Sequence, residues 1–323
     1  MLDAHDQVLI FGHKDADGDT LGCSLAFAEA LRTIGKKVWV LIPPPLPQMY
    51  GWLPGFEHIV EAPPPGSEPR LVLFFDAGNM ERSGDAVRHI AKNATIVNID
   101  HHLSNSMFGD INVIDADAAA VGEMVIPMLE QFGYPITPSI ATNLYTALMT
   151  DTGGFRHENT TAHALETAAK LARLGANPGH IATMVYKSAP LTTLKLAGLS
   201  MAQMQVEAGG RLVWSKVTRH MLKEAAATMA ESEGIIDQLN SIGGMDLAVL
   251  FKEIKPSLTK ISVRSRGNID AAALTGEFGG GGHLRAAGAE ILAPMNEAIK
   301  IVVAAAHASL GSSSGAARSP QPQ

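Results

Sequence analysis

Cysteine is nearly absent from this 323-residue sequence, which contains Cys23 alone. A single cysteine cannot form an intrachain disulfide, and such scarcity is typical of proteins in reducing compartments. Long apolar runs are also missing, so no membrane-spanning helix is expected. Segment 1–7 carries Asp3, His5 and Asp6 and lacks the basic start and apolar run of a signal peptide. We therefore expect a soluble, cytoplasmic protein.

An excess of positive charge is a further feature that the sequence lacks. Its 25 Lys and Arg residues face 32 Asp and Glu residues, which gives a formal net charge of -7. Proteins that grip long nucleic acids through many phosphates usually carry excess Lys and Arg, so binding of a long duplex is not expected. A nucleotidic substrate should therefore be short and bound at a local site.

The pattern of apolar residues indicates an α/β fold. Four short apolar runs are each followed by a polar residue or a proline cluster, at 8–11, 37–42, 71–75 and 95–99. Such runs suit strands that are buried on both faces of a parallel sheet. Helical patterns lie between them, for example at 21–31 and 85–91, so we expect a mostly parallel sheet covered by helices.

The length of the chain and its composition predict two domains. Further helices are expected at 138–149 and 161–174, and strands at 211–217, 247–253 and 258–264 follow a helical stretch. The tail is rich in Ser, Gly, Ala, Pro and Gln, a composition typical of disorder. The expected divisions are a catalytic domain at 1–185, a helical connector at 186–205, a smaller α/β substrate-binding domain at 206–310 and a disordered tail at 311–323.

Acidic and imidazole side chains follow several of the predicted strands and helices. These candidates are His13, Asp17, Asp19, Asp76, His101, His102 and Asp151. In an open α/β sheet, ligands bind beyond the carboxyl ends of the strands. Taken singly, each residue also fits a structural role, as a helix cap or a turn residue. Taken together, the carboxylates would repel one another in a cleft unless two divalent cations balanced them. Carboxylate and imidazole ligands suit Mn²⁺, Mg²⁺ or Fe.

A run of four glycines, 279–282, precedes His283 and Arg285. Glycine backbone permits close approach of a ligand, and its N–H groups can face an anion. The adjacent His283 and Arg285 favour phosphate binding, and Arg264 could add a bidentate contact. A flexible hinge is the alternative role of the glycines, and a solvated surface position is the alternative for Arg264.

Three motifs together give the chain a family resemblance. They are the His-x₃-Asp-Gly-Asp turn at 13–19, the Asp-His-His triplet at 100–102 and the Gly-Gly-Gly-His element at 280–283. The chain resembles the DHH phosphoesterases with a C-terminal DHH-associated domain, and most of all the oligoribonucleases (nanoRNases) that also act as 3′-phosphoadenosine-5′-phosphate phosphatases. The resemblance runs from about residue 7 to about residue 305. Two departures occur, because Ala16 replaces the usual Pro and Asp15 replaces a neutral or basic residue.

The resemblance implies two domains across a cleft and hydrolysis of a phosphoester assisted by two cations, expected to be Mn²⁺ with Mg²⁺ as the alternative. One cation would be bound by His13, Asp17 and Asp76. The other would be bound by Asp19, Asp76, His101 and Asp151, so that Asp76 bridges the two. The catalytic pair would be Asp76 and His102, with His102 at the scissile phosphate or leaving group. Substrate would be bound in the second domain by Arg264, Gly280, Gly281, Gly282, His283 and Arg285.

Several alternatives share the same metal residues. A cyclic- or linear-dinucleotide phosphodiesterase differs only in its substrate, as does an inorganic pyrophosphatase. A RecJ-type exonuclease is disfavoured by the acidic charge, and a catalytically inactive nucleotide-binding protein is disfavoured because every ligand position is filled. Cys23 is expected to pack rather than to act as a nucleophile. The expected partner is a short RNA or small nucleotide, with no membrane, and a homodimer is left open.

Overall fold

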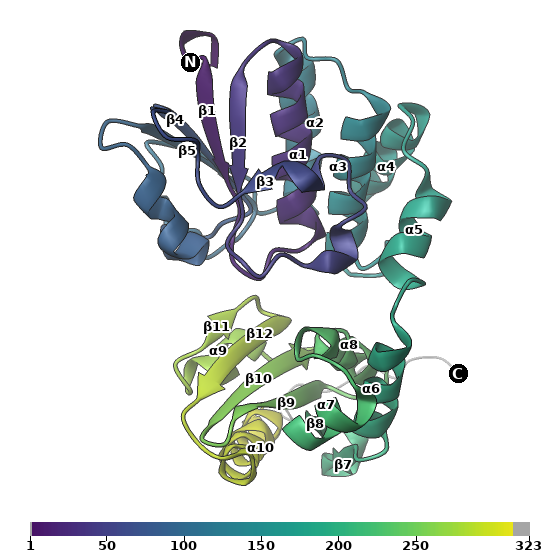
Figure 1. Ribbon diagram of the computed structural model, residues 1–323. Helices are drawn as coiled ribbons and strands as arrows, with labels where there is room; N and C mark the ends of the chain where they lie inside the picture. The colour runs from purple at the N-terminus through teal and green to yellow at the C-terminus, as the bar shows by residue number, and fades with distance from the viewer. Residues whose placement is uncertain (1, 313–323) are drawn as a thin grey trace. The chain divides into compact units, whose positions relative to one another are not determined.

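The computed structural model describes residues 2–312, and the chain divides between Ser188 and Ala189 into two compact units. The first unit contains a six-stranded parallel sheet in the order β3-β2-β1-β4-β5-β6 (Figure 1). Its strands are β1 (Gln7–Phe11), β2 (Lys37–Leu41), β3 (Ile59–Val60), β4 (Leu71–Phe75), β5 (Thr95–Asp100) and β6 (Ile111–Ile114). The predicted α/β class and parallel sheet are thus confirmed.

Helices cover one face of this sheet, and a thinner layer covers the other (Figure 1). The helices are α1 (Gly18–Thr33), α2 (Val121–Gln131), α3 (Pro138–Asp151), α4 (Ala162–Arg173) and α5 (Pro178–Tyr186). Short 3₁₀ segments are η1 (Leu2–Ala4), η2 (Gln48–Tyr50), η3 (Phe56–His58) and η4 (Met80–His89). The thinner layer includes η4, where an α-helical turn was predicted at 85–91; Gly84 breaks this segment with φ 55°.

The run Leu71–Phe75 is buried throughout because its side chains enter two cores. Leu73 and Phe75 pack under α1 to α3, whereas Val72 and Phe74 pack on the opposite face. Strands buried on both faces read as continuous apolar runs. This is why the sequence marks the central strands so clearly.

Helices α1 and α3 approach each other closely at Gly22. A Cβ atom built there would lie 2.4 Å from the backbone oxygen of Asn143 and 3.0 Å from the Cβ of Ala147. Glycine at this position therefore sets the distance between the two helices. The same helix begins with two of the predicted ligands, so its placement also fixes the site.

The second unit contains a mixed sheet in the order β11-β12-β10-β9-β8-β7, in which only β8 and β9 pair in parallel. Its strands are β7 (Gln205–Glu207), β8 (Leu212–Val217), β9 (Leu247–Lys255), β10 (Leu258–Ser265), β11 (Gly281–Gly282) and β12 (Ala286–Ile291). Its helices are α6 (Leu191–Met201), α7 (Arg219–Ala225), α8 (Ile235–Asn240), α9 (Ala271–Gly276) and α10 (Met295–Ser312), with 3₁₀ turns η5 (Ala208–Gly210) and η6 (Ala230–Ser232).

Two hydrophobic cores lie on the two faces of this second sheet. Helix α6, within the segment predicted to connect the domains, packs Leu196 and Ala197 into the core formed with α7 and α8. Residues 313–323 of the predicted tail lie outside the described part of the chain. Within residues 2–312, no helix is both long and apolar enough to cross a bilayer.

Candidate metal centre

The candidate site lies where the strand order reverses. From β1 the chain passes to β2 on one side, and the next central strand, β4, pairs with β1 on the other side. Crevices at such switch points are the usual ligand sites of open α/β sheets. His13 follows β1, Asp76 follows β4 and His101 follows β5, so the parallel sheet brings all three to one edge.

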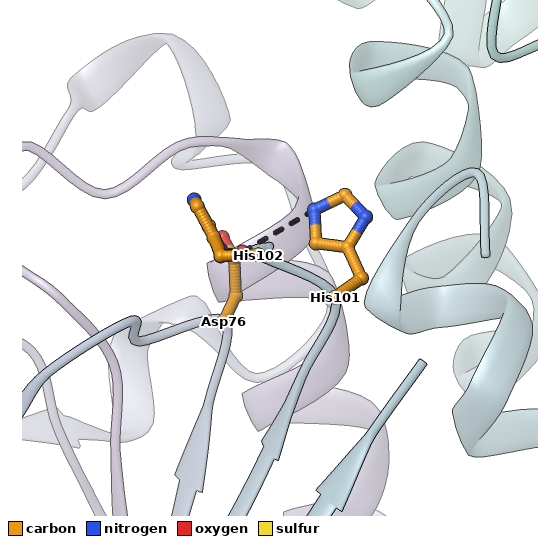
Figure 2. Close-up of side chains that lie close together, drawn as sticks. All are labelled: Asp76, His101 and His102. Atoms are coloured by element: carbon orange, nitrogen blue, oxygen red, sulfur yellow. Dashed lines mark ion pairs between the residues drawn. The ribbon is translucent and has the colours of Figure 1, made fainter. Parts of the chain in front are cut away.

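Asp76 is at the centre of this site. Its side chain is buried, and its backbone adopts a left-handed conformation with φ 57°. Oδ2 accepts a hydrogen bond of 2.6 Å from the Thr20 hydroxyl and lies 3.2 Å from His13 Nε2. Oδ1 lies 3.5 Å from His102 Nδ1 and 3.8 Å from His101 Nε2 (Figure 2). The two oxygens thus face different groups of side chains, as a bridging carboxylate requires.

The two imidazoles His13 and His101 are held in the same way. His13 Nδ1 lies 2.6 Å from the carbonyl oxygen of Lys14, and His101 Nδ1 lies 3.0 Å from that of Ala118. A carbonyl accepts, so each Nδ1 donates its hydrogen to the backbone, and each Nε2 is the ring nitrogen that faces the acids. This arrangement is typical of histidines that bind metals through Nε2.

Asp17 and Asp19 are placed by helix ends. Asp17 Oδ1 accepts from the backbone N–H groups of Asp19 and Thr20 and caps α1, so the structural role considered for this turn is real. Asp19 accepts from the N–H groups of Val121 and Gly122 at the start of α2, at 2.7 and 3.0 Å. The partial positive charge of that helix end stabilises a carboxylate there.

Asp151 ends α3 and completes the site, 3.4 Å from His101 Nε2. Burial and the charge of Asp19 raise the pKa of Asp151 well above its usual value. Burial and the charges of Asp76 and Asp17 raise the pKa of Asp19 to about 7. Asp76 behaves in the opposite way, because the His13 hydrogen bond and the nearby imidazoles outweigh burial and lower its pKa. With all of these acids ionised, the site would therefore hold more negative charge than the neighbouring side chains balance.

A divalent cation fits this surplus of charge. Three overlapping groups have candidate ligand atoms within 4.8 Å of one another: His13, Asp17 and Asp76; Asp19, His101 and Asp151; and Asp76, His101 and His102. Ligands bound at about 2.1 Å lie roughly 3–3.5 Å apart. The separations of 3.2 Å between His13 and Asp76 and 3.4 Å between His101 and Asp151 agree with this spacing. Oxygen and imidazole ligands without thiolate favour a hard or borderline cation.

The structure also places here residues that were not among the predicted site residues. Asp100, the first residue of the Asp-His-His triplet, is fully buried and accepts from His102 Nδ1 at 2.7 Å. It also accepts from the backbone N–H of His101 and from Asn105 Nδ2. Arg82, in η4, lies 3.4 Å from His102 Nε2. The triplet itself is a signal for Asp100, whereas Arg82 and Thr20 have no motif in the sequence.

Cys23 is buried beside the site but has the wrong chemistry for a nucleophile. Its thiol donates to Asp19 Oδ1 at 3.2 Å. Burial and the charge of Asp19 raise its pKa, so the thiolate is disfavoured. A protonated, fully buried thiol is consistent with the packing role predicted for Cys23.

The remaining candidates lie in the second unit. Arg264, near the end of β10, is half-buried and donates to Asp237 at 3.2 Å and to the carbonyl of Val263. His283 is exposed, and its backbone pairs with Ala286, the residue opposite Arg264 in the sheet. Arg285 donates to the carbonyl of Ile269 at 3.1 Å, so part of its guanidinium supports its own domain.

The glycines of this element have a structural purpose as well. A Cβ atom at Gly280 would lie 2.2 Å from the oxygen of Gly288, and one at Gly282 would lie 2.6 Å from the oxygen of Ala286. Both glycines therefore permit the close approach of this segment to β12. Gly281 is itself paired with Gly288, but a Cβ atom there would meet nothing within 4 Å, so that side of its backbone is open to a ligand. The strand pairing argues against the flexible hinge considered from the sequence.

Comparisons with known proteins agree with this architecture. The model of the DHH family, N-terminal domain, matches residues 7–149, and that of the DHHA1 domain matches residues 209–309. The bifunctional oligoribonuclease and PAP phosphatase NrnA of Thermus thermophilus is 32% identical over 88% of this chain and 84% of its own. The protein of that name from Bacillus subtilis is 26% identical over 90% of this chain and 91% of its own. An exopolyphosphatase-related protein from Bacteroides fragilis has a solved structure that covers 95% of this chain and 93% of its own, with 27% identity and a TM-score of 0.88.

A parallel sheet with acids and imidazoles gathered at its switch point is typical of an α/β protein with a site suited to divalent metal. The chain belongs to the DHH phosphoesterase family, with a DHH domain followed by a DHHA1 domain. The family resemblance drawn from the three motifs is therefore confirmed.

Proposed function

We propose that this protein is a manganese-dependent, two-metal phosphoesterase that hydrolyses short oligoribonucleotides, 3′-phosphoadenosine-5′-phosphate, or both. The names of the relatives from Thermus thermophilus and Bacillus subtilis combine these two activities. The net charge of -7 supports a short substrate bound at a local site rather than a long nucleic acid. The mixture of carboxylate and imidazole ligands supports Mn²⁺, with Mg²⁺ as the alternative.

In this proposal, one cation is held by His13, Asp17 and Asp76. The other is held by Asp19, Asp76, His101 and Asp151. When bound, such a pair lowers the pKa of a water molecule and stabilises charge that develops on the phosphoryl oxygens. The chain orients the ligands: Lys14 and Ala118 fix the two imidazoles through their carbonyl oxygens.

The observation that carries the proposal is the position of Asp76 between two groups of ligand atoms. One oxygen faces His13 and the other faces the Asp-His-His segment. Its left-handed φ of 57° is tolerated by Asp and Asn better than by other side chains. A carboxylate held in this strained position supports a functional role.

Asp76→Asn tests this assignment, because an amide keeps the shape and tolerates the backbone but removes the bridging charge. We expect manganese bound per chain to fall and hydrolysis to drop at least about 1000-fold, as for loss of an essential catalytic group. Asp110→Asn, at an exposed acid outside the three ligand groups, is the matched control. Hydrolysis near the wild-type rate in the Asp76 variant would rule out a bridging role.

A panel of substrates tests the substrate class. It should contain 3′-phosphoadenosine-5′-phosphate, RNAs of two to five nucleotides, linear and cyclic dinucleotides, and pyrophosphate. We expect the first two to be hydrolysed fastest. A preference for a cyclic dinucleotide or for pyrophosphate would replace the proposed substrate and leave the metal site intact.

We further propose that Arg264, the backbone at Gly280, Gly281 and Gly282, His283 and Arg285 contact the substrate. Its support is the open backbone at Gly281 beside the exposed His283. His283→Ala should raise KM while leaving manganese content unchanged. A fall in manganese content would show that His283 acts at the metal centre instead.

A further inference from the structure

Arg82 is a guanidinium that the assigned site does not use. It lies in η4, and its backbone is tied to the turn that carries His13: the Arg82 carbonyl accepts from Lys14 N–H at 2.7 Å. The next residue, Ser83, donates its hydroxyl to the carbonyl of Gly12 at 2.9 Å. Arg82 is therefore held to the end of β1, although 71 positions separate Ser83 from Gly12 in the sequence.

The directions of two hydrogen bonds at His102 can be assigned from chemistry. A guanidinium only donates, so His102 Nε2 must accept from Arg82 Nη1, at 3.4 Å. The hydrogen of the imidazole is then on Nδ1, which donates to Asp100 Oδ1 at 2.7 Å. Asp100 is itself fixed by Asn105 and by the backbone of His101. The result is a chain of donors that runs from Arg82 through His102 to Asp100.

This chain gives His102 no N–H to offer a phosphate, whereas Arg82 keeps most of its donors. A guanidinium has five N–H groups, and within residues 2–312 Arg82 directs one side-chain hydrogen bond to His102 and forms no ion pair with a carboxylate. A half-buried guanidinium beside a cluster of acids, without an acid as partner, is suited to an anion that arrives with the substrate.

We propose that Arg82 binds the phosphoryl group of the substrate, and that Asp100 and His102 are positioning residues that hold its guanidinium. The inference rests on the proposed phosphoesterase function and alters one part of it. The contact to the scissile phosphate passes from His102 to Arg82. The ligand class is a phosphoryl oxygen anion, and the fork of the guanidinium allows two parallel hydrogen bonds to it.

A double-mutant cycle tests this assignment in the manganese-loaded protein, with 3′-phosphoadenosine-5′-phosphate and a diadenylate RNA as substrates. Arg82→Ala should lower kcat/KM about 100- to 1000-fold, the usual loss for one preorganised donor. His102→Ala should lower kcat/KM nearly as much in the wild-type protein. In the Arg82→Ala background it should lower kcat/KM by less than about 3-fold, since His102 acts through Arg82. The kcat/KM of Arg82→Lys should fall between those of the wild type and Arg82→Ala. Millimolar guanidinium ion should partly restore the activity of Arg82→Ala. Arg88→Ala, at an exposed position of the same segment, is the matched control.

Two further readouts keep this inference distinct from the proposed function. Manganese content and melting temperature should be unchanged in Arg82→Ala, and its affinity for orthophosphate, measured by calorimetry, should fall at least about 10-fold. The role of Arg82 would be overturned if the loss of kcat/KM in the double variant equalled the product of the losses in the two single variants. Equal orthophosphate affinity in wild type and Arg82→Ala would overturn it as well. Failure of the wild-type protein to hydrolyse either substrate would instead overturn the proposed function, and the orthophosphate measurement would still decide on Arg82.

Discussion

Removal of divalent metal should destabilise the first unit, and the loss should grow as the pH rises. Without a cation, protons must neutralise part of the acid cluster. The pKa of Asp19 is raised from 3.8 to about 7 by burial and by neighbouring acids. A raised acid pKa in the folded state means that stability is lost as the pH rises through the window from about 4 to about 7. His101 adds to the effect: burial opposes its charge, but Asp151, Asp19 and Asp76 raise its pKa to about 9.

The His101 contribution has the same sign at higher pH. Its stabilisation is complete below pH 6.5 and is lost as the pH rises through about 9. Asp76, with a lowered pKa, contributes no slope above pH 4. One pKa unit corresponds to about 1.4 kcal/mol, so Asp19 alone accounts for up to roughly 4 kcal/mol. Asp19 and His101 each contribute to the pKa shift of the other, so their interaction is counted once. We therefore expect the free energy of unfolding of the metal-free protein to fall by about 2–4 kcal/mol as the pH rises.

Calorimetric melting of chelated and manganese-loaded protein from pH 5.5 to 8.5 measures this effect. At about 2–4 °C per kcal/mol, the difference in Tm between the two forms should widen by on the order of 5–15 °C. Groups outside the site titrate in both forms, so their contribution cancels in the Tm difference between the chelated and the manganese-loaded protein. Asp19→Asn should flatten the slope, although its amide must face one of the N–H groups of Val121 and Gly122 and so lowers Tm overall. A Tm for the chelated protein that stays level or rises with pH would refute the reasoning.

Two further predictions concern packing and charge away from the site. Gly22→Ala should destabilise the first unit by about 1–3 kcal/mol in urea unfolding, because the added Cβ meets Asn143. The matched change Gly198→Ala, in α6 with open space around it, should stabilise the second unit by about 0.5–1 kcal/mol, and destabilisation there would contradict this account. Glu233→Ala should cost about 1–3 kcal/mol, since Lys252 is fully buried and pairs with Glu233 at 2.7 Å. Adding Lys252→Met should recover most of that loss, and no recovery would exclude the unpaired charge as its cause.

The sequence predicts the first unit well because its fold and chemistry share one signal. Continuous apolar runs mark the central parallel strands, and the polar residue after each run lies at the edge where ligands bind. His13, Asp76 and His101 are therefore brought together as expected from strand order alone. The contact of Asp19 with the start of α2 was not predictable, because it joins residues 102 positions apart without a motif.

The second unit is less evident from its sequence. Strand β12, Ala286–Ile291, consists largely of small residues with low β-propensity, and its conformation is set by pairing with β10. The role of Arg82 was hidden for a related reason. Its significance depends on the direction of a hydrogen bond to His102, and a lone arginine in a polar segment has no periodicity or spacing that marks it.

The close approach of Gly280 and Gly282 to β12 has a consequence for affinity. A glycine run is usually a floppy chain that must be ordered when a ligand arrives, at a cost in conformational entropy. Here the sheet has already ordered it, with the intervening Gly281 backbone exposed. A ligand that binds this edge meets a preorganised surface and loses little free energy to loop ordering.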